Sequence, residues 1–100
     1  VNLRVLIKMA QVVVTIKIMP ESPDVNLEDL KGKVEEKIKG FAGEGEMKFE
    51  EDPIGFGLSA LKVLFAMDEE KGDTEKLEED IKTIEGIVSA EVIDMRRALG

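Results

Sequence analysis

Cysteine, histidine, tryptophan and tyrosine are all absent from this chain of 100 residues. Without cysteine there is no disulfide, no thiolate metal site and no cysteine nucleophile. Without histidine there is no imidazole base and no histidine ligand for zinc. The longest apolar runs, near residues 12–14 and 61–67, have the length of strands rather than of membrane spans. We therefore expect no metal, no cofactor and no covalent catalysis.

Acidic residues outnumber basic ones, and the formal net charge is −8. A negative field of this size repels the phosphates of nucleic acids and of anionic membranes. We therefore expect no direct nucleic-acid binding and no membrane binding, but a protein partner with a basic face. The first residues lack the length and cleavage site of a secretory signal, which favours a cytoplasmic protein.

The spacing of apolar residues predicts six elements of secondary structure. Strands are expected at residues 11–19, 46–52, 58–67 and 88–96, and helices after caps at Asn26 and at Asp73 or Thr74. Gly86 is predicted to end the second helix. Val88, Ala90 and Val92 are predicted to share one face of the last strand.

The order β-α-β-β-α-β predicts the fold class. It is α+β and ferredoxin-like: a sandwich in which two helices cover one face of a four-stranded antiparallel sheet. Some domains of this class bind RNA by stacking bases on aromatic side chains of the central strands. Here those strands offer Thr15, Lys17, Ala60 and Lys62 on the open face, which argues against RNA binding.

The segment Pro53-Ile54-Gly55-Phe56-Gly57 places a large aromatic side chain between two glycines. Glycine adopts positive φ and lets another backbone come close. Two interpretations follow from the residues alone: Phe56 plugs the core while the glycines shape a bulge, or it inserts into a partner. The acidic clusters at 50–52 and 78–80 are interpreted as solvated surface rather than as a metal site.

Three stretches of the sequence resemble elongation factor 1-beta, and in particular its stand-alone archaeal form. They are VVVTIKIMPESPDVNLEDL, EDPIGFGLSALKV and IEGIVSAEVIDMRRAL, and the resemblance runs from about Met9 to Leu99. Met9-Ala-Gln-Val-Val is similar to the start of these relatives. We therefore expect residues 1–8 to be an N-terminal extension and residues 9–100 to be a single exchange domain.

The resemblance implies a guanine nucleotide exchange factor that promotes GDP release and GTP loading on the GTPase elongation factor 1-alpha. It implies that Phe56 inserts into that partner near its switch elements. In eukaryotic relatives a lysine before the terminal leucine displaces magnesium; the matching position here is Ala98, so that role passes to a neighbouring arginine or is performed indirectly. The expected partner-binding residues are Ile54, Gly55, Phe56, Gly57, Arg96 and Arg97, and the protein is expected to be monomeric alone.

Two other classes of function are known for domains of this fold. A ligand-binding or oligomerisation module is a common use of this fold. A hydrolase of the acylphosphatase type would need an arginine-bearing, phosphate-binding loop after the first strand, where this chain has Met-Pro-Glu-Ser-Pro-Asp. The acids and prolines of that loop argue against the hydrolase.

Overall fold

A computed structural model of the chain describes residues 11–43, 45–68 and 74–97. The extension expected at residues 1–8, the alternative cap Asp73 and the position Ala98 lie outside these residues. The elements, in chain order, are β1 (Gln11–Pro20), α2 (Leu27–Ala42), β2 (Met47–Gly55), β3 (Leu58–Asp68), α3 (Thr74–Lys82) and β4 (Ile87–Arg97). The predicted order β-α-β-β-α-β is confirmed.

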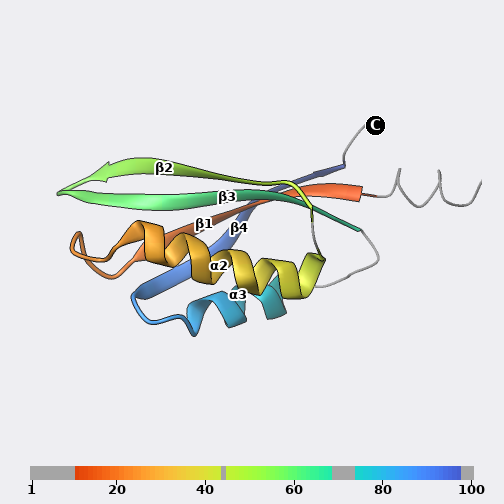
Figure 1. The fold of residues 1–100 in the computed structure, drawn as a ribbon. Helices are drawn as coiled ribbons and strands as arrows, with labels where there is room; N and C mark the ends of the chain where they lie inside the picture. Colours follow the sequence, from red (N-terminus) through yellow and green to blue (C-terminus); the bar gives the residue numbers. More distant parts are fainter. Residues whose placement is uncertain (1–10, 44, 69–73, 98–100) are drawn as a thin grey trace, which may run out of the picture.

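The four strands form one sheet in the order β2-β3-β1-β4, and each neighbouring pair is antiparallel. Both helices lie on the same face of the sheet (Figure 1). The predicted ferredoxin-like sandwich is therefore confirmed. Because β1 and β3 are the central strands, β2 and β4 are left as the edges.

The core lies between the sheet and the helices. Alternate residues of the two central strands point toward the helices and are buried, as period-two patterning requires. The buried set consists mainly of Val12, Val14, Ile16, Ile18, Leu30, Val34, Ile38, Leu61, Val63, Phe65, Met67, Leu77 and Ile81. Burial of one such side chain contributes about 1.5–3 kcal/mol, so this layer accounts for most of what holds the sandwich together.

The second strand is longer than predicted. It continues through Pro53, which pairs with Ser59, to Gly55. Proline is tolerated here because β2 is an edge strand, where a residue can lack an N–H without costing the sheet a hydrogen bond. The result is a long β2–β3 hairpin that carries the glycine-rich segment at its tip.

Two predictions for the last helix and strand are wrong. Helix α3 ends at Lys82, because Thr83 and Ile84 bond back to residues three positions earlier, at 3.2 and 3.0 Å, and close the last turn. Gly86 instead lies at φ 97° in the turn that leads into β4.

Val88 is 64% exposed, whereas Ala90 is buried and Val92 is half-buried. The register of β1 with β4 shifts between Met19 and Pro20 and again between Thr15 and Ile16. The first shift leaves Val88 outside the paired residues. A bulge re-aims a side chain, so Val88 departs from the face that simple alternation assigns to it.

The open face of the sheet is polar at its centre. Thr15, Lys17 and Lys62 are half-buried there, as the pattern predicts, whereas Ala60 is wholly buried. Asp52 of β2 lies directly opposite Ala60 of β3. The Asp52 carboxylate forms an ion pair with Lys62, two residues along β3 from Ala60, at 3.4 Å, so these longer side chains lie beside the small Ala60 side chain. Neither helix within the described residues has the length and apolarity needed to cross a membrane.

Candidate functional site

Phe56 forms the tip of the β2–β3 hairpin and is wholly exposed, with 100% of its surface accessible. Its φ is 55°, in the left-handed region, and its neighbours Gly55 and Gly57 also have positive φ, at 105° and 76°. A large L-residue in this region costs about 1–2 kcal/mol. The interpretation of Phe56 as a core plug is therefore wrong: a strained turn holds the ring in solvent. Ile54, two residues earlier, is 39% exposed.

The β1–α2 loop supports this turn. A Cβ atom on Gly57 would lie 3.8 Å from both Cβ and Cγ of Pro23, so the backbone of the turn rests against the proline ring. The same loop is tied to the α3–β4 connection, because the backbone N–H of Glu21 donates to the carbonyl of Gly86 at 2.9 Å. A Cβ on Gly86 would lie 3.3 Å from Cγ1 of Val25. Three connections distant in sequence thus meet at one end of the molecule, on the left in Figure 1.

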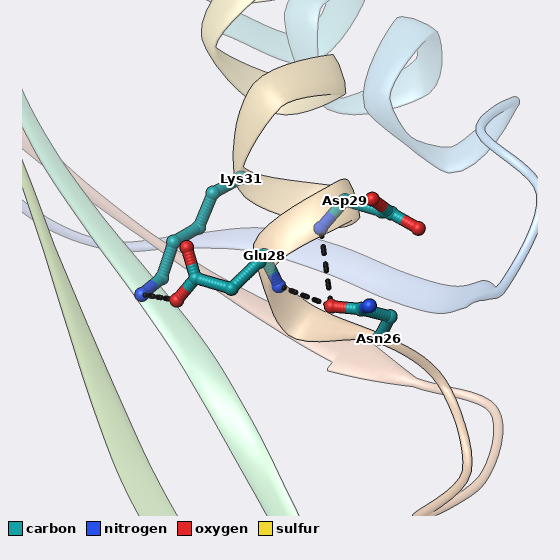
Figure 2. A network of polar contacts seen from close by, with 4 residues as sticks. All are labelled: Asn26, Glu28, Asp29 and Lys31. Atoms are coloured by element: carbon teal, nitrogen blue, oxygen red, sulfur yellow. Dashed lines mark hydrogen bonds and ion pairs between the residues drawn. The ribbon is translucent and has the colours of Figure 1, made fainter.

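The start of α2 fixes the far side of the loop. The Oδ1 atom of Asn26 accepts from the backbone N–H groups of Glu28, at 2.9 Å, and Asp29, at 3.4 Å (Figure 2). Lys31 pairs with Glu28 at 3.0 Å in the same turn. The predicted N-cap is confirmed, and it satisfies two of the donors that a helix start leaves unpaired.

A pocket of about 200 Å³ opens at the base of the Phe56 turn. Its walls come from the end of β1, the β1–α2 loop, the first residue of α2, the hairpin turn and the start of β3: Pro20, Ser22, Pro23, Val25, Leu27, Gly57 and Ser59. The sequence interpretation missed this pocket, because its walls are far apart in the chain and none of these residue types stands out alone. The Pro-Glu-Ser-Pro loop was the one available signal, since it belongs to a stretch that carries the family resemblance.

Charge is distributed unevenly around this end. Residues 20–29, 50–59 and 83–89 contain no lysine or arginine, and their acids are Glu21, Asp24, Glu28, Asp29, Glu50, Glu51, Asp52 and Glu85. Within the described residues, three lysines outside these segments reach three of these acids: Lys31 pairs with Glu28, Lys48 with Glu50 and Lys62 with Asp52. The exposed ring of Phe56 therefore stands at an acidic end of the molecule.

The two expected arginines lie at the opposite end of the sheet. Arg96 pairs with Val13 and Arg97 with Val12, near the start of β1, whereas Pro20 at its other end pairs with Ile87. Pro20 lies seven positions after Val13 along β1, which corresponds to about 23 Å. The structure thus brings Ile54, Gly55, Phe56 and Gly57 together, but it does not bring Arg96 or Arg97 to them.

The Arg96 side chain is 80% exposed, and its Nε lies 3.0 Å from Oδ2 of Asp94. A wider groove of about 380 Å³, lined in part by Val13, Leu64 and Ala66, lies toward this second end. Its other walls come from Glu46, Met47, Lys48 and Phe65, so two charged side chains border a mainly apolar groove.

Within residues 11–43, 45–68 and 74–97, no cluster of three or more acids, cysteines or histidines has the geometry to hold a metal ion. The acidic stretch at 50–52 lies along an edge strand, where Glu50 is 3.5 Å from Lys48. The feature that stands out at this end is the projecting aromatic ring, which suits recognition of a partner.

Comparison with known proteins gives the family. The EF-1 guanine nucleotide exchange domain matches residues 13–98. Elongation factor 1-beta of Methanothermobacter thermautotrophicus is 47% identical over 91 residues, which cover 91% of this chain and 100% of that protein. Elongation factor 1-beta of Methanobrevibacter smithii is 44% identical and covers 91% and 100%; that of Methanosphaerula palustris is 41% identical and covers 87% and 96%.

Among solved structures, the de novo designed protein Foldit4 is similar with a TM-score of 0.58 and 23% identity, over 90% of this chain and 98% of that one. This likeness concerns the fold alone. The sequence matches carry the function: the chain belongs to the EF-1 guanine nucleotide exchange domain family, together with the archaeal elongation factors 1-beta, and is an exchange factor of translation elongation.

Proposed function

We propose that this chain accelerates GDP release from elongation factor 1-alpha by inserting Phe56 into that GTPase. The observation that carries the proposal is the wholly exposed ring held at φ 55° between two glycines. Backbone strain of this kind persists where the surrounding structure enforces it, and it concentrates at functional sites. Burial of an exposed phenylalanine in a partner's pocket would supply the main anchor of the interface.

The exchange mechanism is one of coupled binding. The factor binds nucleotide-free GTPase more tightly than nucleotide-bound GTPase, so by linkage it weakens nucleotide binding and is displaced when nucleotide returns. No bond is made or broken in this cycle. In this proposal residues 9–100 act as one cytoplasmic monomer without nucleic acid or membrane contacts, and residues 1–8 are an extension.

The flanking residues have supporting roles. Gly55 and Gly57 supply the positive φ values that the turn requires, and exposed Ile54 extends the apolar tip. In this proposal Arg96 or Arg97, at the other end of the sheet, makes a second contact; the effect on magnesium that a lysine has in eukaryotic relatives passes to one of these arginines or is exerted indirectly. A partner that touches both ends would span about 23 Å or more along the sheet.

Stopped-flow release of a fluorescent GDP analogue from elongation factor 1-alpha tests the proposal. The wild-type chain should accelerate release, and Phe56→Ala should remove most of the acceleration, because loss of an anchor of this size costs about 2 kcal/mol or more. Phe56→Leu, which retains apolar bulk, should fall between the two. Equal release rates with and without the wild-type chain would refute the function.

A further inference from the structure

The pocket beside the Phe56 turn has a mainly polar accessible surface to which a few apolar side chains contribute. Pro23, Val25 and Leu27 line it together with the hydroxyl-bearing residues Ser22 and Ser59. Ser22 Oγ accepts from the backbone N–H of Asp24 at 3.3 Å, whereas Ser59 makes no side-chain hydrogen bond within the described part of the chain. Gly57, which lines the pocket, is the residue next to Phe56, so the pocket and the projecting ring lie at the same end of the molecule.

The charges around the pocket favour a cation. Glu21 and Asp24 belong to the loop that forms one wall; both are exposed, and neither has an ion-pair partner among the residues that the structure describes. The start of α2 could instead favour an anion, since the N-terminus of a helix carries partial positive charge. However, Asn26 already occupies the N–H groups of Glu28 and Asp29. The exposed carboxylates of Glu21 and Asp24, which flank the lining residues Ser22 and Pro23, therefore favour a cation.

We propose that this pocket receives one lysine or arginine side chain of the partner GTPase, packed beside the Phe56 ring. The inference rests on the proposed function, because the same partner must cover the turn. The aliphatic stem of such a side chain would lie along Pro23, Val25 and Leu27, and its charged head would donate to the serine hydroxyls and face the acids of the loop. The interface is thus reciprocal: this chain supplies an apolar projection and accepts a cationic one.

Affinity for nucleotide-free elongation factor 1-alpha, measured by titration calorimetry at low and high salt, tests the pocket. Ser59→Met fills the pocket without adding charge and should raise the Kd about tenfold at both salt concentrations. Ser22→Met fills the pocket from the β1–α2 loop and should raise the Kd by a similar factor. Two variants are used so that the test still stands if one of the substitutions disturbs the fold. Thermal melting of each variant verifies folding.

Charge is tested with a matched pair of reversals. Glu21→Lys should raise the Kd about tenfold at low salt and less at high salt, because salt screens exposed charges. Glu36→Lys makes the same charge change at an exposed position on α2 that does not line the pocket. This control should raise the Kd less than about twofold.

The outcomes separate the two proposals. Wild-type affinity in both folded methionine variants, equal shifts in the two lysine variants, or tighter binding by Glu21→Lys would overturn the cationic pocket. In those cases loss of exchange in Phe56→Ala would leave the proposed function intact. Absence of any acceleration by the wild-type chain would instead reject the function on which the inference rests.

Discussion

Phe56 combines two costs that a residue selected for stability alone would avoid: an aromatic ring fully in water and a left-handed backbone conformation. Replacing it with glycine removes the strain, and part of that gain is offset by the greater freedom of glycine in the unfolded chain. We expect Phe56→Gly to raise the free energy of unfolding in urea by about 0.5–1 kcal/mol while it abolishes exchange.

Phe56→Ala is the matched control for this prediction. Alanine retains the left-handed strain, and truncation of a fully exposed ring removes no buried surface, so its free energy of unfolding should stay within about 0.5 kcal/mol of the wild type. A larger loss of stability in Phe56→Ala would mean that the ring packs against this chain, contrary to its observed exposure.

At the scale of elements, the cap of α2 links folding to the site, because the capped turn also forms a wall of the pocket. Asn26→Ala removes the side-chain acceptor for two backbone donors and should destabilise the protein by about 1 kcal/mol, which lowers the melting temperature by about 4–8 °C. Asn26→Asp retains an acceptor oxygen and should melt close to the wild type. Calorimetric melting curves of both variants test this prediction. An equal fall in melting temperature in Asn26→Ala and Asn26→Asp would show that loss of the side-chain acceptor does not cause the destabilisation.

The elements that the sequence predicts correctly are those with strong periodicity. The stripes of β1 and β3 and the capped start of α2 depend on local spacing and local hydrogen bonds, which are visible along the chain. The errors fall where tertiary pairing overrides local pattern. Val88 leaves the buried face because β1 and β4 slip in register, and β2 continues through Pro53 because an edge strand does not need that proline's missing donor.

The candidate site was predictable only in part, for the same physical reason. The glycines on either side of Phe56 indicated an unusual turn, but exposure of the ring depends on what the rest of the fold leaves uncovered. The pocket requires Pro23 of the β1–α2 loop to meet Gly57 of the hairpin turn at one end of the sandwich, and no spacing within the chain encodes that contact. Motif resemblance likewise grouped Phe56 with Arg96, whereas antiparallel pairing of β1 with β4 separates them.

At the scale of the whole molecule, this separation predicts independence of the two ends. Substitutions more than about 7–10 Å apart that share no partners usually add, to within about 0.5 kcal/mol. Phe56 lies beyond the Pro20 end of β1, and Arg96 pairs with Val13 near the other end. Phe56→Ala and Arg96→Ala should therefore each lower the exchange rate, and the double variant should show the sum of the two losses in activation free energy.

The rate constants of GDP release for wild type, both single variants and the double variant give this coupling directly. Asp94→Asn serves as a control for the second end, because it removes the carboxylate that holds Arg96 at 3.0 Å without removing the guanidinium. If the arginine contacts the GTPase, this variant should retain more exchange than Arg96→Ala. A coupling energy between the two substitutions above about 1 kcal/mol would contradict the prediction that the two contacts are independent. Because the two ends are so far apart in the sheet, such a coupling would have to act through the partner.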